Sequence, residues 1–138
     1  MMMRNDPDTA IDWRGQAVSC EPCQERLIPG LRCELLHACV HDRYAKRVER
    51  FFVWNPQVAN QYLQHDYFEV RACAARQADI FHLPALMNDI DETVRWAVAQ
   101  RLPERYLLQM IHDPHREVRI RIAARLSDLN LSAMMHDD

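Results

Sequence analysis

The chain has 138 residues, of which 49% are hydrophobic and 27% are charged, and its formal net charge is −3. This length is that of one domain, and the composition is that of a folded protein rather than a disordered one. The negative charge disfavours nucleic-acid binding, and no apolar stretch approaches the length that spans a bilayer. The first residues lack the apolar core of a secretory signal, so we expect a cytoplasmic protein.

Four of the five cysteines lie close together near the start of the chain, in the order C-x2-C-x9-C-x5-C. In a reducing compartment, clustered thiols bind metal more often than they form disulfides. Four thiolates can hold either a tetrahedral zinc ion or an iron–sulfur cluster, and this spacing departs equally from zinc ribbons and from the familiar ferredoxin patterns. We therefore predict one metal centre, zinc or iron–sulfur, with the ligands Cys20, Cys23, Cys33 and Cys39.

Other residues near this set offer weaker alternatives. His37 and His41 stand beside Cys39, and imidazole suits zinc and the Rieske type of cluster. Because four cysteines already complete a site, we expect neither histidine to replace a sulfur. The fifth cysteine, Cys73, falls in a helical position of a later repeat, and we expect a plain small side chain there. Four unrelated buried thiols are the remaining interpretation, which the clustering disfavours.

An aromatic segment follows the cysteines and includes Phe51, Phe52 and Trp54, with Tyr62 further along. Large aromatic side chains at this place suit an interface between the cysteine module and the rest of the chain. Projecting the later repeat back onto this segment puts charged residues where apolar ones belong. We therefore expect a degenerate or shifted block, with Val48 and Phe52 as the inward pair.

From residue 65 onward the sequence repeats at a fixed period of about 24 residues, which lies within the range of solenoid repeats. A valine, the arginine after it and an alanine five places beyond the valine recur three times, beginning at Val70, Val94 and Val118. Val94, Val98 and Leu102 lie at i, i+4 and i+8, which is one face of a helix. Pro84 and Pro103 punctuate two of the blocks, so we expect a second, short 3₁₀-like element in each unit.

These features predict an all-α protein, because no block has the alternating apolar pattern that places a strand in ordinary leucine-rich repeats. A unit this short cannot bury its own apolar stripe, so neighbouring units stack into a short helical-repeat solenoid. We assign residues 12–64 to a cysteine-rich metal-binding module and residues 65–138 to a solenoid of about three repeats.

One column of the repeat is charged and consists of Arg71, Arg95 and Arg119, with Asp89 and Asp113 in a neighbouring column. Such a row either forms a ladder of internal ion pairs or faces a ligand. We expect the internal ladder, since equivalent positions in stacked units usually serve the stack.

Several segments together resemble one known family: Asp12-Trp13-Arg14-Gly15, the four spaced cysteines, Arg50-Phe51-Phe52, residues 91–96 and Arg101-Leu102-Pro103. The chain resembles the leucine-rich repeat variant (LRV) proteins of nitrogen-fixing bacteria, which carry an amino-terminal 4Fe-4S cluster. The resemblance implies a right-handed superhelix of alternating α and 3₁₀ helices. It also implies that the metal centre is a 4Fe-4S cluster, held by Cys20, Cys23, Cys33 and Cys39.

Two functions follow from this resemblance. The first is a non-catalytic iron–sulfur protein, associated with nitrogen fixation, whose repeats bind an unidentified protein partner. The second is an electron carrier or redox sensor, and a zinc-capped binding module is the alternative if the metal is zinc. The chain has no glycine-rich phosphate loop, no nucleophile elbow and no radical-type cysteine run, so we expect neither enzymatic activity nor a small-molecule substrate.

Overall fold

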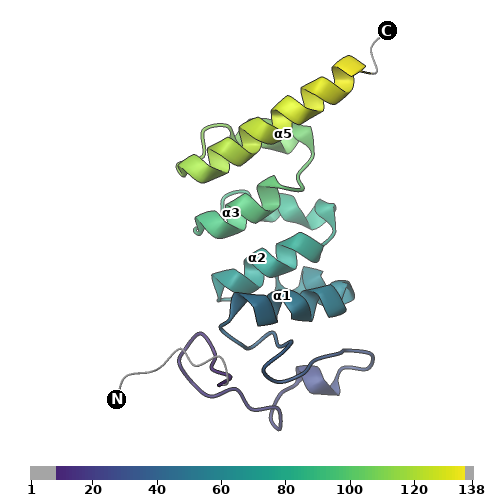
Figure 1. The fold of residues 1–138 in the computed structure, drawn as a ribbon, viewed down its shortest axis with the longest axis vertical. Coiled ribbons are helices and arrows are strands. Elements are labelled where there is room, and N and C mark those ends of the chain that lie inside the picture. Colours follow the sequence, from purple (N-terminus) through teal and green to yellow (C-terminus); the bar gives the residue numbers. More distant parts are fainter. Residues whose placement is uncertain (1–8, 136–138) are drawn as a thin grey trace.

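The computed structural model describes residues 9–135, in which helices stack in chain order above a loop-rich amino-terminal segment (Figure 1). The described amino-terminal and carboxy-terminal segments lie at opposite ends of the stack. The elements are η1 (Glu25–Leu27), α1 (Ala45–Trp54), η2 (Pro56–Tyr62), α2 (Phe68–Gln77), η3 (Ile80–Leu86), α3 (Glu92–Ala99), α4 (Glu104–Leu107), η4 (Leu108–Met110) and α5 (Arg116–Met135), where η denotes a 3₁₀ helix.

The predicted all-α class is confirmed. Within residues 9–135 the only extended pairings are two isolated bridges, Ile11 with Ala17 and Glu34 with Ala38. None of the described helices is both long and apolar enough to cross a lipid bilayer. Residues 136–138, the last of the predicted solenoid, lie outside the described part of the chain.

The units alternate an α-helix with a 3₁₀ helix, as the proline positions predict. Pro56 opens η2, Pro84 lies inside η3, and Pro103 stands at the start of α4. Proline has no backbone N–H and cannot continue an α-helix, so Pro56 and Pro103 prevent α1 and α3 from continuing, whereas α2 ends at Gln77, well before Pro84. Helix α2 packs between α1 and α3, and α3 packs on α5. The helical stack therefore includes α1, and the division of the chain near residue 64 stays a prediction.

The last block differs from the expectation of a second short element. Helix α5 runs without a break from Arg116 to Met135. The position that Pro103 occupies in the preceding unit holds Ser127 here, one repeat period later. Serine keeps its backbone N–H and leaves the helix uninterrupted.

The core runs through the stack from α1 to α5. Val70, Val94 and Val118 are fully buried, one in each of the three repeats. In α1, Val48 and Phe52 are fully buried while Lys46 is exposed, which confirms the shifted inward pair.

The predicted internal ladder of arginines is confirmed for Arg71 and Arg95, whereas Arg119 is exposed and donates to the backbone carbonyl of Asp113 at 2.7 Å. Nε and Nη2 of Arg71 donate to the carboxylate of Asp89, at 2.9 and 3.0 Å. Arg95 makes the same pair with Asp113, with 2.9 Å between Nε and Oδ2. Each pair joins one unit to the next, and all four side chains are largely buried. In such surroundings a charge is tolerated because its partner neutralises it.

A second row of arginines was not anticipated from the sequence. Arg101 Nη1 donates to the carbonyls of Ala75 and Ala78, at 2.7 and 2.6 Å, and Arg125 Nη1 donates to the carbonyl of Ala99 at 3.1 Å. These carbonyls lie at the carboxyl ends of α2 and α3. The last carbonyls of a helix have no N–H group of the same helix to accept from, and this end of the helix carries partial negative charge. The two arginines are one repeat period apart, so the signal was present in the sequence.

We predict that Arg95→Ala lowers the free energy of unfolding by about 3–5 kcal/mol, because it leaves the buried carboxylate of Asp113 without its partner. Urea unfolding followed by circular dichroism measures this change. The matched control is Arg116→Ala, since the Arg116 side chain is 79% exposed and its loss should change stability by no more than about 0.5 kcal/mol. Equal urea concentrations at the unfolding midpoint of the two variants would contradict the stabilising role of the ladder.

Candidate metal centre

The first two cysteines lie on a tight turn. Cys23 N–H donates to the carbonyl of Cys20 at 3.3 Å, and the short helix η1 begins two residues later. The chain then turns back at Gly30, whose φ of +81° lies in the left-handed region that glycine adopts most readily. These local turns direct the chain from the first pair of cysteines toward the second.

The other two cysteines are brought together by a small hairpin. Glu34 and Ala38 exchange two backbone hydrogen bonds, of 2.9 and 2.8 Å, so Cys33 and Cys39 flank an antiparallel bridge. Leu36, at the tip, has a φ of 68°, a left-handed conformation that costs a non-glycine residue about 1–2 kcal/mol. The five residues between the cysteines therefore form a short path that places both side chains beside the same cavity.

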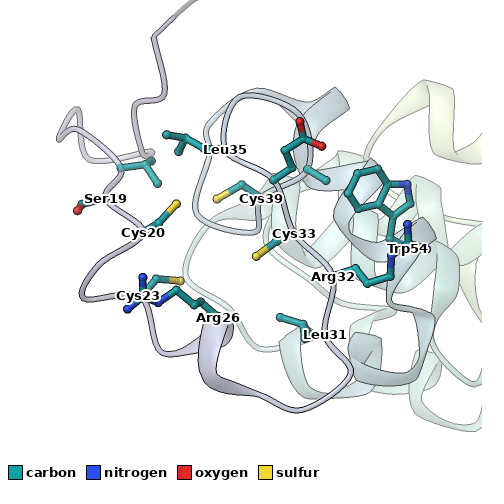
Figure 2. Close-up of a pocket in the computed structure, with 13 residues that line it drawn as sticks. Ser19, Cys20, Cys23, Arg26, Leu31, Arg32, Cys33, Leu35, Cys39 and Trp54 are labelled. Carbon is teal, nitrogen blue, oxygen red and sulfur yellow. The ribbon is translucent and has the colours of Figure 1, made fainter.

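The side chains of all four cysteines point toward one cavity at the end of the helical stack (Figure 2). The cavity has a volume of about 540 Å³. Its wall combines the cysteines with apolar and basic side chains, among them Leu31, Leu35, Trp54, Arg26 and Arg32. The structure thus brings together every cysteine of the predicted ligand set.

Neither histidine lines this cavity. His41 Nε2 lies 2.8 Å from a carboxylate oxygen of Glu25. The ring of His37 lies 5.7 Å from that of Trp54, and its carbonyl accepts a hydrogen bond from Arg50 at 2.8 Å. That four sulfurs complete the set without a histidine stays a prediction.

The chemistry of this donor set fits a thiolate-bound metal centre. Burial raises the pKa of Cys39 to about 11 and also raises the pKa of Cys23 and Cys33. Without a metal these thiols keep their protons at neutral pH, and binding a metal displaces the protons. The cavity wall also holds the guanidinium groups of Arg26 and Arg32 and the carboxylate of Glu34, so its positive charge offsets part of the thiolate charge.

Comparison with known proteins agrees with this site. Residues 10–61 match the family model described as LRV protein FeS4 cluster. The chain contains an LRV FeS4 cluster domain. The resemblance to leucine-rich repeat variant proteins with an amino-terminal iron–sulfur domain is therefore confirmed, and the chain is an iron–sulfur-binding repeat protein.

Two longer relatives extend the similarity beyond the FeS4 domain. A protein of Rhodobacter capsulatus, described as "Uncharacterized 27.7 kDa protein in nifB 3'region", is 48% identical over 94 residues, which are 67% of this chain and 38% of that protein. A solved structure of a leucine-rich repeat variant with a novel repetitive structural motif superposes with a TM-score of 0.74 and 40% identity, covering 87% of this chain and 53% of that chain. The chain thus spans about half of that structure and less of the curated relative, and it has the LRV fold.

Asn55 joins the FeS4 domain to the first helix of the stack. Its buried amide accepts from the N–H of Arg32 at 2.8 Å and donates to the carbonyl of Arg32 at 2.6 Å and to that of Phe51 at 2.8 Å. Arg32 immediately precedes Cys33, so this amide fixes the backbone next to a predicted ligand. An Asn-Pro pair after a helix marks a turn in the sequence, but nothing in it identifies the partner.

Glu25 forms a second connection between the FeS4 domain and the stack. Its carboxylate accepts from the thiol of Cys23 at 3.4 Å and from the hydroxyl of Tyr62 at 3.2 Å, and it lies beside His41. Burial alone would raise the pKa of Glu25, but the hydrogen bond and charge of His41 outweigh it and lower the pKa below its usual value. Tyr62 in turn packs edge-on against the buried side chains of Phe51 and Phe52.

Trp13 provides a third connection. Its ring lies 4.7 Å from His65 and stacks on Tyr67 at 5.8 Å, between ring centroids. His65 Nδ1 accepts from the N–H of Tyr67 at 3.0 Å, and Asp89 and Asp113 accept the corresponding bonds in the next two units. The Asp-Trp-Arg-Gly segment therefore packs against the start of the first clear repeat.

Cys73 lies apart from this site. It is buried in α2, and burial raises the pKa of its thiol to about 12. Its Sγ lies 3.9 Å from the carbonyl oxygen of Ala45 in α1. This thiol packs between neighbouring helices, as a small side chain does.

We predict that Asn55→Ala lowers the free energy of unfolding by about 1–3 kcal/mol, because the partly buried N–H and carbonyl of Arg32 lose their partner. Hydrogen exchange at the Arg32 amide should accelerate along with this loss of stability. Asn60→Ala is the matched control, since the Asn60 side chain pairs in the same manner with Asp79 at an exposed site. An unchanged exchange rate at Arg32 in the Asn55 variant would contradict this connection.

A further prediction concerns acid stability. Burial lowers the pKa of His65, although the charge of Asp66 opposes this effect, so the folded chain favours the neutral ring. The stability that His65 contributes is complete above the unfolded pKa of about 6.5 and is lost as the pH falls from there through the folded pKa. His65→Asn keeps an acceptor for the Tyr67 N–H and removes the titration.

Urea unfolding at pH 7.5 and at pH 5.5 provides the measurement for this prediction. The wild-type chain should lose more stability between the two pH values than His65→Asn does. The same loss in both chains would show that His65 does not couple protonation to folding.

Proposed function

We propose that Cys20, Cys23, Cys33 and Cys39 hold a 4Fe-4S cluster at the amino-terminal end of the solenoid. The observation that carries this proposal is the convergence of all four side chains on one cavity. Four thiolates are the usual ligands of such a cluster. The FeS4 description of the matching family model supports the same metal.

The size of the site favours a cluster over a single zinc ion. Its volume of about 540 Å³ far exceeds the roughly 30 Å³ of one water molecule. Zinc–sulfur bonds of about 2.3 Å require the sulfurs of a tetrahedral site to lie about 3.8 Å apart. Among the described residues, no three of these sulfurs lie within 4.8 Å of one another.

We propose a non-catalytic role in which the FeS4 domain closes the end of the stack and the repeats bind a protein. The proposed contacts of this protein-binding surface are two exposed apolar side chains, Phe81, which is 86% exposed, and Ile90, which is 94% exposed. The location of the Rhodobacter relative in a nifB region supports a link to nitrogen fixation. We also propose a cytoplasmic location, where reducing conditions would keep clustered thiols free to bind metal.

A redox-responsive role is the second candidate, and Trp54 favours it. This side chain lines the cysteine cavity and also an outer groove on α1, together with Lys46, Glu49, Arg50 and Val53. An iron–sulfur cluster bound in the cavity supplies one-electron chemistry, with a potential set by net charge, hydrogen bonds and exposure. Trp54 and Asn55 would carry a change at the site to the surface of α1.

The first experiment measures iron, labile sulfide and zinc in protein purified without air, together with a visible spectrum. We expect about four irons and four sulfides per chain and a brown absorbance that bleaches on reduction. One zinc ion per chain in a colourless sample would overturn the cluster and leave a zinc-capped binding module.

We predict that Cys33→Ala loses the cluster and loosens residues 12–64, because the binding energy of the metal is also folding energy. Iron content and hydrogen exchange across this segment report the two effects. Cys73→Ala is the control and should keep its iron, since Cys73 lies in α2 away from the cavity. Full iron content in Cys33→Ala would exclude Cys33 as an indispensable ligand.

The redox-responsive role has its own test. Hydrogen exchange at Arg32 and in α1, together with X-ray scattering in solution, is compared between the reduced and the oxidised protein. A difference confined to Arg32, Trp54 and Asn55 would support the sensor. Identical exchange and scattering would exclude a sensor and leave electron transfer or a structural role.

The protein-binding surface is tested by affinity capture with matched chains. A partner that binds at this surface should be recovered by the wild-type chain and lost with Phe81→Ser or Ile90→Ser. Glu104→Ser, at an exposed charged position of α4, serves as the control. Equal recovery by all of these chains would place the interaction elsewhere.

A further inference from the structure

Three metal-binding side chains meet beside the cysteine cavity. The thiol of Cys23, a carboxylate oxygen of Glu25 and Nε2 of His41 all lie within 4.8 Å of one another. Glu25 Oε2 is 3.4 Å from Cys23 Sγ and 2.8 Å from His41 Nε2. Two of these residues come from the turn that opens η1, and the third comes from the loop before α1.

The chemistry of the three groups is that of a zinc site. Thiolate, imidazole and carboxylate are the three protein ligand types that zinc prefers, and its ligand distances of about 2.0–2.3 Å suit atoms already this close. One thiolate and one carboxylate together neutralise the charge of Zn²⁺. The Glu25 side chain is only 17% exposed and that of His41 is 33% exposed, so few waters compete for these atoms.

A neighbouring group and a neighbouring cavity complete the arrangement. The hydroxyl of Tyr62 donates to the second carboxylate oxygen of Glu25 at 3.2 Å, which orients the carboxylate as outer-shell partners of metal ligands do. Cys23 and His41 also line a separate cavity of about 220 Å³, bounded by Asp12, Arg14 and Ser19. Three protein ligands beside an accessible cavity match zinc sites that keep a fourth position for water.

We infer that Cys23, Glu25 and His41 form a site for one zinc ion in the chain that holds no iron–sulfur cluster. This inference goes beyond the proposed function and does not require it. Cys23 lines both cavities, so its sulfur serves either the four-cysteine set or this three-residue set. The cluster and the zinc ion at this site are therefore alternative occupants of the FeS4 domain.

The test uses the full chain with Cys20→Ser, Cys33→Ser and Cys39→Ser, which removes the four-cysteine site and keeps the three-residue set. Zn²⁺ is titrated in competition with a chromophoric chelator, and Co²⁺ serves as a spectroscopic substitute. We expect one zinc ion per chain and a cobalt spectrum with a single-thiolate charge-transfer band. Absence of zinc binding in this folded variant would overturn the inference.

Substitutions in the same background identify the ligands. Cys23→Ser, Glu25→Gln and His41→Ala should each weaken zinc binding by more than about tenfold, and Tyr62→Phe should weaken it by about tenfold. Glu34→Gln is the matched control and should have no effect, because Glu34 lines the other cavity. Zinc affinity that is unaffected by Glu25→Gln and His41→Ala would overturn the assignment.

Two further chains keep the test independent of folding and of the proposed function. Circular dichroism establishes whether the triple variant folds, and Cys20→Ala/Cys33→Ala, which changes only the two exposed cysteines, is titrated in parallel. In the otherwise wild-type chain, His41→Ala should retain its iron and sulfide. Loss of iron in that variant would make His41 a ligand of the cluster and overturn the separate zinc site.

Discussion

The stack of helices depends on buried guanidinium groups that reach from one unit to the next. Arg71 and Arg95 each bind a carboxylate in the following unit. Arg101 donates to a carbonyl near the end of α2, the helix of the preceding unit. Because an unpaired buried charge is costly, each unit is complete only when its neighbour is in place. The same pairs set the register of the stack, since a displaced unit would leave its aspartate without a partner.

This constraint makes the amino-terminal end a special case, because within the described residues no α-helix comes before α1. Arg47 of α1 pairs at 2.9 Å with Asp42, a residue of the adjoining loop. The amide of Asn55 and the hydroxyl of Tyr62 then fix the chain around the cysteines against the helices. The cysteine-rich segment thus occupies the place of a preceding unit, and it does so with loops rather than with another α-helix.

Features that recur at a fixed spacing were predictable from the sequence. The valine and arginine columns, and the four cysteines with their short gaps, indicated the fold class, the internal ladder and the shared cavity. Asn55 and Glu25 were missed because each acts once, on a partner 23 or 37 residues away. The uninterrupted α5 was missed for a different reason. A break in the last unit was expected by analogy with Pro103, but the equivalent residue is Ser127, which does not break a helix.

The connections of the cysteine-rich segment also govern the order in which the protein can form. The turn at Cys20 and the hairpin at Cys33 close over a few residues and need nothing else. Their fixed positions, however, depend on Asn55 and Tyr62, and contacts between distant residues form later than local ones. During synthesis from the amino terminus, the cysteines leave the ribosome before residue 62 and wait until it has emerged. The cysteines are therefore made before the helical residues that fix them in place.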